Sequence, residues 1–254
     1  MNIKDKMTDD YIKDMLVRMA HHSTAIEGNT LTLAETVSIL INNYIPREMP
    51  EKDYNEIRNY RMVFPILLNS AGQKLTTELI KEYTKIVMTN LRDDAGQYKK
   101  IENIVLGAEF EPIKSYQVPY VMQDWCDNYN FRMKNAKTTE EKIEIILDQH
   151  IKFERIHPFG DGNGRTGRLL IIDSCLRENL APIIIPKAEK NKYINFLANE
   201  DVKNFTKWAL ELQKKELERM KLFQNNENLS KNNVRNEKRE VRSRIRSNSK
   251  ENGR

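Results

Sequence analysis

The sequence has few of the residues that mark several protein classes. Only two of its 254 residues are cysteines, Cys126 and Cys175, and their spacing fits neither a metal-binding pattern nor a disulfide framework. No apolar run is long enough for a membrane-spanning helix, and the opening residues lack the apolar region of a signal peptide. The sequence therefore predicts a cytoplasmic protein with two reduced cysteines and no membrane association.

Glycine is scarce too, with nine residues in the chain, and the Gly-Lys-Ser/Thr triplet of a Walker phosphate loop is absent. Four of the nine glycines nevertheless fall within residues 157–168, HPFGDGNGRTGR. Glycine lets backbone amides approach a ligand closely, and amides at a helix start attract phosphate oxygens. A nucleotide phosphate chain is therefore the first ligand to consider.

Residues 162–167 also match the G-x-G-x-x-G pattern of dinucleotide-binding folds, but that pattern requires a preceding strand. Residues 139–156 instead predict a helix, because apolar residues recur at helical spacing. Thr138 and Glu141 form a capping-box pair at its start. The sequence thus disfavours a dinucleotide-binding fold at this place.

The net charge of +5 lies entirely in residues 224–254, which carry nine basic and four acidic residues. Their richness in Asn, Ser and Arg, with almost no apolar residues, predicts a basic disordered tail. Its basic residues could contact nucleic-acid phosphates. Nucleic-acid binding is disfavoured, however, because the tail has no aromatic residue to stack on a base.

Helical periodicity dominates the rest of the chain and predicts a mainly α-helical fold. The first predicted helix spans residues 8–27, has one apolar face and ends at Gly28. Residues 101–113 are the exception, because alternation around Gly107 and a closing Pro112 predict a short β-hairpin, with an irregular loop as the alternative. Further helices are predicted at residues 32–42, 51–69, 77–91, 118–134, 139–156, 162–179, 187–198 and 201–223.

Two segments resemble motifs of the Fic family. Residues 23–28 resemble (S/T)-x-x-x-E-(G/N), the inhibitory motif of Fic proteins with an inhibitory helix on the N-terminal side. Residues 157–168 resemble the family signature H-x-F-x-(D/E)-G-N-(G/K)-R-x-x-R. That second match holds at every fixed position: His157, Phe159, Asp161, Gly162, Asn163, Gly164, Arg165 and Arg168. Together the two resemblances span most of the chain.

The resemblance implies a Fic-fold helical bundle in which the hairpin, called the flap, lies over the active site. Residues 1–75 would hold the N-terminal helices with the inhibitory helix, residues 76–223 the catalytic core, and residues 224–254 the tail. The implied activity is protein adenylyl transfer, in which AMP moves from ATP to a Ser, Thr or Tyr hydroxyl of a target protein or of the enzyme itself, and pyrophosphate is released. An extended target segment would pair with the flap, formed around Ile104, Val105, Leu106 and Gly107.

The resemblance also assigns roles to single residues. His157 would be the general base that accepts the hydroxyl proton, since the ordinary pKa of histidine suits that task at neutral pH. Asp161 would bind Mg²⁺ or Mn²⁺, with capping of the next helix as the simpler role. Phosphate contacts are predicted for Gly162, Asn163, Gly164, Arg165 and Arg168.

Three further residues are assigned around Arg168, which would hold the γ-phosphate. Glu27 would pair with Arg168 and so misplace ATP, and Ser23, one turn earlier, would help to position Glu27. The alternative for Glu27 is an ordinary acid at a helix end. Tyr193 is predicted either to contact the nucleotide or to belong to the core.

Other functions stay open at this point. A Doc-type kinase is disfavoured, because its motif has Lys where this chain has Gly164. Hydrolytic removal of AMP, with Glu27 activating water, is an alternative. A non-catalytic regulatory protein is another, although His157 and Asp161 are intact. The sequence leaves open the target protein, the nucleotide base and the oligomeric state, a homodimer included.

Overall fold

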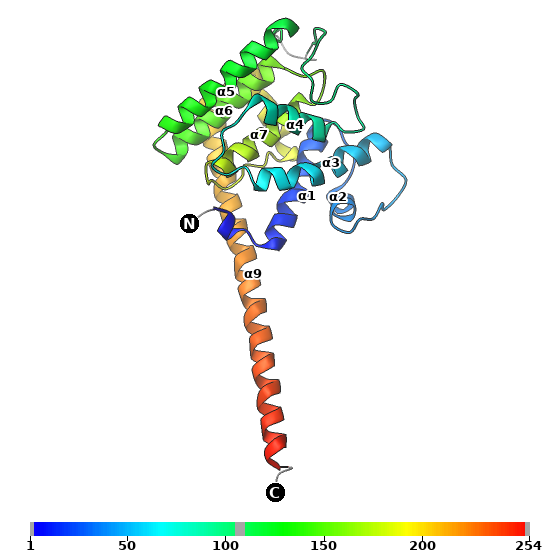
Figure 1. The fold of residues 1–254 in the computed structure, drawn as a ribbon, viewed down its shortest axis with the longest axis vertical. Coiled ribbons are helices and arrows are strands. Elements are labelled where there is room, and N and C mark those ends of the chain that lie inside the picture. Colours follow the sequence, from blue (N-terminus) through cyan, green and yellow to red (C-terminus); the bar gives the residue numbers. More distant parts are fainter. Residues whose placement is uncertain (1–2, 105–109, 252–254) are drawn as a thin grey trace.

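The computed structural model describes residues 3–104 and 110–251, with the backbone alone for residue 230 and residues 232–251. Within these ranges the chain is mainly α-helical, as predicted, and its last helix extends far beyond the body formed by the others (Figure 1). None of the described helices is both long and apolar enough to span a membrane. The α-helices are α1 (Asp9–Ile26), α2 (Leu33–Leu40), α3 (Glu51–Leu68), α4 (Thr77–Val87), α5 (Val118–Asn135), α6 (Thr139–Ile156), α7 (Asn163–Arg177), α8 (Lys190–Ala198) and α9 (Val202–Glu251). Short 3₁₀ helices at Ile3–Lys6, Ser115–Gln117 and Lys187–Glu189 precede α1, α5 and α8.

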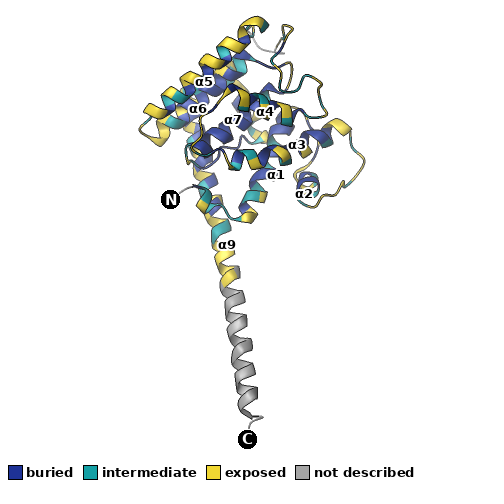
Figure 2. Cartoon of the chain, in the orientation of Figure 1, coloured by how far each residue is buried: buried dark blue, intermediate teal, exposed yellow. Residues whose placement is uncertain are grey.

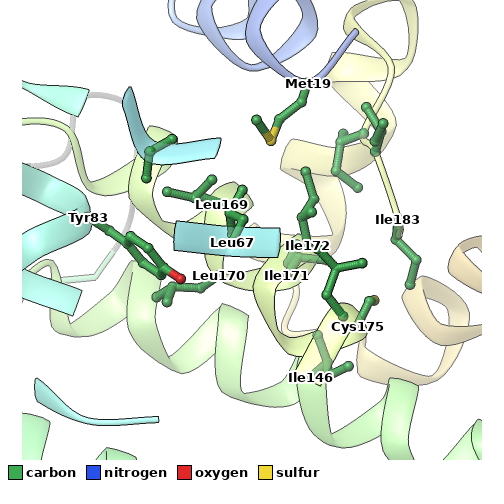
Figure 3. Packing of buried hydrophobic residues seen from close by; sticks show 14 of the residues in the cluster. Met19, Leu67, Tyr83, Ile146, Leu169, Leu170, Ile171, Ile172, Cys175 and Ile183 are labelled. Atoms are coloured by element: carbon green, nitrogen blue, oxygen red, sulfur yellow. The ribbon is translucent and has the colours of Figure 1, made fainter. Parts of the chain in front are cut away.

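Helix α7 lies in the core of the body, and every residue from Arg165 to Arg177 is buried. Figure 3 shows its apolar side chains among residues of α1, α3, α4 and α6. Its polar side chains are paired inside this core, as at Asp173, which accepts hydrogen bonds from Tyr83 Oη at 2.8 Å and Arg177 Nε at 2.5 Å. Because buried polar groups are costly unless they are paired, these bonds let α7 be buried on all sides. Any ligand that reaches its N-terminus therefore meets a firmly held element.

Capping residues fix the starts of the helices that lead to the site. The predicted capping box at Thr138 with Glu141 is present at the start of α6, and Thr32 with Glu35 forms another at the start of α2. Thr8 caps α1, because its Oγ1 accepts a hydrogen bond from Tyr11 N at 3.2 Å. These bonds satisfy amides that have no acceptor within the helix, so α1 and α6 begin within a residue of the predicted positions.

One hydrophobic core joins the N-terminal helices to the rest of the chain. Polar contacts add to it at the start of α1, where Tyr11 Oη donates to Glu216 of α9 at 2.6 Å and Arg18 pairs with the same carboxylate at 2.6 Å. Residues on both sides of the predicted boundary near residue 75 therefore belong to the same hydrophobic core.

The end of α9 differs from the sequence prediction. Residues 224–251 are helical and continue α9 without a break, although their composition predicts disorder. The segment contains neither Gly nor Pro and many of its residues are Lys, Arg or Glu, which favour helix. Glu227 and Lys231 also pair across one turn at 2.6 Å. Residues 225–229 are exposed, so the helix there continues α9 without burial of its side chains (Figure 2).

The segment predicted to form the flap is described only in part. Val105, Leu106 and Gly107 lie outside the described residues, so the hairpin stays a prediction. Within residues 3–104 and 110–251 the β-pairing is limited to one antiparallel bridge, between Tyr98 and Phe159. This bridge places the chain that leads into the flap directly against the loop before α7.

Candidate active site

The loop from His157 to Gly162 joins α6 to α7, and its two ends have left-handed backbone conformations. His157 ends α6 with a φ of 49°, and Gly162 precedes α7 with a φ of 82°. Glycine adopts positive φ freely, whereas a residue with a Cβ is strained there. Such strain persists where the surrounding structure enforces it, often at functional positions. The loop thus brings the candidate base and the start of α7 within a few residues of each other.

Hydrogen bonds to neighbouring backbone hold this loop in place. Lys99 N donates to Pro158 O at 2.9 Å, and Asn103 Nδ2 donates to Phe159 O at 3.0 Å. Phe159 is 1% exposed and so anchors the loop in the hydrophobic core. Asn163 Oδ1 accepts from Phe159 N at 2.9 Å, and Asn163 Nδ2 donates to Phe159 O at 2.8 Å. The Asn163 side chain therefore braces the loop, and its predicted contact with phosphates stays a prediction.

The N-terminus of α7 has the properties of an anion site. Its first backbone hydrogen bond runs from Thr166 N to Gly162 O at 2.9 Å, so the amides of residues 163–165 have no acceptor within the helix. These amides carry the positive end of the helix dipole. An anionic group such as a phosphate is therefore favoured at this position.

His157 is half-buried and oriented by the backbone of its own helix. Its Nδ1 lies 3.3 Å from the carbonyl oxygen of Glu154. A carbonyl can only accept, so Nδ1 carries the proton in this bond and Nε2 carries the lone pair. Burial lowers the pKa of His157, and the nearby Lys99 cation lowers it further. The imidazole is therefore neutral at neutral pH, the form that a general base requires.

Asp161 is the exposed acid of the loop, with 54% of its side chain accessible to solvent. Its Oδ1 accepts from Gly162 N at 2.5 Å and from Arg165 Nη2 at 3.3 Å. Among residues 3–104 and 110–251 no group of three or more His, Cys, Asp or Glu side chains could hold a metal ion. A single accessible carboxylate still fits Mg²⁺, which takes hard oxygen ligands and often gains most of them from phosphates and water.

Arg168 is buried and held by the end of α1. Its Nη2 donates to Glu27 Oε1 at 2.6 Å and to the carbonyl of Ser23 at 2.9 Å, while its Nε donates to Ser23 Oγ at 3.1 Å. Burial by itself would raise the pKa of Glu27, but the Arg168 guanidinium outweighs it and holds that pKa below its usual range. Glu27 is thus ionised and paired. Ser23, predicted only to position Glu27, binds the arginine directly.

Gly164 makes room for this ion pair. A Cβ at residue 164 would collide with Glu27 Oε1 and lie 3.0 Å from Arg168 Nη1. A larger side chain there, such as the lysine of Doc-type proteins, would therefore displace the Glu27 carboxylate. The glycine of the motif and the glutamate of α1 are sterically matched.

Arg165 contacts two carboxylates of the protein. Its Nη1 donates to Glu56 Oε1 of α3 at 2.8 Å, and its Nη2 contacts Asp161. The sequence predicted a phosphate contact for Arg165 and missed Glu56. The available signal was that Glu56 shares the helical register of the buried residues Tyr60, Val63 and Leu67, where an acid is unusual.

Tyr193 lies in the core next to Arg168 and is 1% exposed. Its hydroxyl is 2.9 Å from His150 Nε2, and its ring centre is 5.9 Å from Arg168 Cζ. Glu154, which the sequence did not single out, lies nearby, with its Oε1 at 3.9 Å from His150 Nε2. Its Oε1 has no hydrogen-bond partner within the described part of the chain, and burial raises its pKa to about 8. A signal was present, because His150 and Glu154 lie four residues apart and so share one face of α6.

Comparison with known proteins agrees with this geometry. Residues 74–173 match the Fic/DOC family. It is similar to proteins named protein adenylyltransferase Fic, with 31% identity over 211 residues to the one from Drosophila willistoni and 30% identity over 211 residues to the one from Drosophila melanogaster. Each alignment covers 81% of this chain and 42% of the relative, so the chain spans about two fifths of the length of these relatives.

Two solved structures share the fold. A Fic-domain-containing signaling protein from Bacteroides thetaiotaomicron matches with a TM-score of 0.74 and 23% identity, covering 87% of this chain and 98% of that one. Fic-1 from C. elegans matches with a TM-score of 0.68 and 22% identity, covering 90% of this chain and 67% of that one. Identities this low show the common fold alone, and that fold includes most of the helices described above.

Proposed function

We propose that the protein is a protein adenylyltransferase, which transfers AMP from ATP to a hydroxyl group of a target protein and of itself, and that Glu27 inhibits it. The main structural support for this proposal is the loop of residues 157–162 and the start of α7. It combines a neutral His157, whose Nε2 bears a lone pair, with amides at the start of α7 that have no acceptor within the helix. The names of the Drosophila relatives support AMP transfer as the reaction.

In this proposal the hydroxyl oxygen of the target attacks the α-phosphorus of ATP. The bond from the α-phosphorus to the bridging oxygen of the β-phosphate breaks, and pyrophosphate leaves. The hydroxyl proton passes to Nε2 of His157. The amides of residues 163–165 stabilise negative charge on the phosphate oxygens, and Arg168 binds the γ-phosphate and so orients ATP. Mg²⁺ or Mn²⁺, held by Asp161 and the phosphates, would offset charge on the leaving pyrophosphate.

Inhibition follows from the contacts of Arg168. Its guanidinium donates to Glu27 and to Ser23, so it cannot bind a γ-phosphate in the same geometry. Because Glu27 belongs to the same chain, its effective concentration at Arg168 is high. ATP that enters beside this pair would have its phosphates misplaced for in-line attack.

The target protein would lie along the flap, residues 101–113. Ile104 is 85% exposed, which suits a residue that contacts a partner. The preceding residue, Asn103, donates a hydrogen bond from Nδ2 to Phe159 O, so the start of the flap is fixed relative to the catalytic loop. A strand of the target paired with the flap would therefore have a defined position relative to His157. A cytoplasmic location stays a prediction of the sequence.

The direct test is to incubate the purified Glu27→Gly variant and the unchanged protein with ATP, CTP, GTP or UTP and Mg²⁺. Mass analysis of the intact protein then reports whether a nucleotide has been added and which one. A mass increase of one AMP group with ATP supports the proposal. Addition of a phosphate alone would show a Doc-like kinase, and no covalent product on the protein or on added lysate proteins would favour a non-catalytic regulatory role.

Removal of AMP is a second candidate because Glu27 is ionised and 38% exposed, so its carboxylate is able to activate water. Incubation of an AMP-modified protein with the unchanged chain separates the two reactions. Release of AMP that depends on Glu27 would favour hydrolysis, whereas a stable modified protein would favour transfer alone.

The transfer rate should change with pH through the ionisation of His157. Burial lowers the pKa of this residue, so the neutral base persists to lower pH than in an exposed histidine. In the Glu27→Gly background we expect kcat/KM to be flat near neutral pH and to fall as pH drops through a midpoint below about 6.5, the unperturbed histidine value. A midpoint above that value would contradict His157 as a half-buried base.

Replacing Asp161 with alanine should remove metal binding at the nucleotide and most turnover with it. The reason is that Asp161 supplies the one accessible carboxylate of the loop. Asp161→Glu is expected to keep part of the activity, since it preserves the hard oxygen donor. Calorimetric titration of Mg²⁺ into protein with bound nucleotide measures this, and unchanged Mg²⁺ affinity in Asp161→Ala would refute the role.

A further inference from the structure

Glu56 of α3 is a buried acid that connects two parts of the site. Its side chain is 3% exposed. Its Oε1 accepts from Arg165 Nη1 at 2.8 Å, and its Oε2 accepts from Asn29 Nδ2 at 2.9 Å. Asn29 lies two residues after Glu27 in the segment that follows α1. One carboxylate therefore fixes both the turn after the inhibitory helix and an arginine of the phosphate loop.

Arg165 stands between a buried acid and an exposed one. Its side chain is 5% exposed, its Nη1 contacts Glu56, and its Nη2 contacts Asp161 at the longer distance of 3.3 Å. Its Nε has no hydrogen-bond partner among the described residues. A divalent cation bound to the Asp161 carboxylate would lie close to the Arg165 guanidinium, so the arginine and the cation compete for the negative charge of one carboxylate.

The strengths of the two contacts decide that competition. Charges interact more strongly in a buried setting than at the surface, and the contact with Glu56 is both the shorter and the more buried one. Arg165 therefore has a charge partner even when Asp161 turns to a cation. Without Glu56, the arginine would hold a buried positive charge whose only acidic contact is Asp161.

On the basis of the proposed function, we propose that Glu56 is a positioning residue for metal binding. It holds Arg165 so that Asp161 is available to the divalent cation. It acts through Arg165 and does not itself contact the nucleotide or the cation. The structure offers no other acid within hydrogen-bond distance of Arg165 in the described residues than Glu56 and Asp161.

The test measures Mn²⁺ affinity in the presence of an ATP analogue whose α,β-bridging oxygen is a methylene group, so that no transfer occurs. The bound fraction is followed by electron paramagnetic resonance of Mn²⁺. In Glu56→Gln the side chain keeps its size but loses its charge and one acceptor. We expect Mn²⁺ affinity to fall by roughly tenfold, as is common when a residue that supports a metal ligand is changed.

A double-mutant cycle separates positioning from a general structural effect. In an Arg165→Gln background no guanidinium competes with Mn²⁺ for Asp161. Glu56→Gln should therefore cause no further loss of Mn²⁺ affinity. An equal loss in both backgrounds would overturn the proposal, because Glu56 would then act independently of Arg165. Thermal unfolding of each variant checks the fold. If Glu56→Gln is unfolded, Glu56→Asp serves in its place, with a smaller expected loss that again depends on Arg165.

Asp53→Asn is the matched control. Asp53 lies in the same helix, is buried, and accepts from Thr30 N and Thr30 Oγ1 at 3.4 and 2.8 Å, but it does not contact Arg165. Its Mn²⁺ affinity should equal that of the unchanged protein. If the unchanged protein binds no Mn²⁺ with the nucleotide, the metal role in the proposed function fails together with this proposal. If it binds and Glu56→Gln binds equally well, this proposal alone fails.

Discussion

Replacing Glu27 with glycine is expected to raise AMP transfer, including self-modification, by roughly 10- to 100-fold, the range that corresponds to one hydrogen bond to a charged group. The reason is the pair between Glu27 Oε1 and Arg168 Nη2 at 2.6 Å. Once the carboxylate is removed, this nitrogen is available to the γ-phosphate. Ser23 still accepts from Arg168 Nε at 3.1 Å, so the arginine should stay in place in the variant.

Intact-mass analysis with labelled ATP measures the effect. Glu27→Gln, which keeps the size of the side chain and removes its charge, should give a smaller increase, because the amide oxygen can still accept from Arg168. Arg168→Ala placed on Glu27→Gly should cancel the gain, since both residues act through one contact. An unchanged rate in Glu27→Gly, with Arg168→Ala still inactive, would leave the catalytic proposal standing and reduce Glu27 to an acid at a helix end.

The helices that lead to this site could be predicted because their signals are local. Thr138 and Glu141 lie three residues apart, and a capping box depends on nothing beyond that spacing. The apolar periodicity of residues 139–156 likewise depends on one helix, and α6 has the predicted bounds. The left-handed conformation of His157 was not predicted, because it arises from the packing of the loop between α6 and α7.

Side-chain partners within the motif could be predicted only in part. The pairing of Glu27 with Arg168 followed from the resemblance and has the expected geometry. Asn163 and Arg165 belong to the same motif, yet the sequence did not predict their hydrogen-bond partners. Asn163 binds the backbone of Phe159, and Arg165 binds Glu56. A motif specifies which residues are present, whereas the direction of each side chain depends on distant segments such as α3. Glu154 lies outside the motif, so the resemblance did not point to it.

The tail illustrates a conflict between composition and local propensity. Low hydrophobicity and net positive charge in residues 224–254 predict that the segment lacks a core to pack on, and the exposure of residues 225–229 agrees with that. Composition does not determine backbone conformation, however. A run without Gly or Pro that continues an existing helix needs no new nucleus, so α9 extends to Glu251.

Replacing His157 should abolish transfer while leaving the protein folded and able to bind ATP. Loss of a general base typically lowers the rate by about 10²- to 10⁴-fold. ATP binding should persist because the amides of residues 163–165 and Arg168 do not depend on the imidazole. The measurement is made in the Glu27→Gly background, where the starting rate is high, with ATP affinity followed by calorimetry.

Two variants keep the result interpretable. His157→Ala removes the base but leaves a residue with a Cβ at a φ of 49°, and any loss of activity could then reflect a shifted loop. His157→Asn also lacks a basic nitrogen, yet asparagine tolerates left-handed backbone better than most residues. Because the carbonyl of Glu154 that orients the ring belongs to the backbone, it is unchanged in both variants. Loss of transfer in both variants, with unchanged ATP affinity, would assign the proton transfer to His157. Full activity in folded His157→Asn would overturn the assignment, because asparagine has no basic nitrogen to accept the hydroxyl proton.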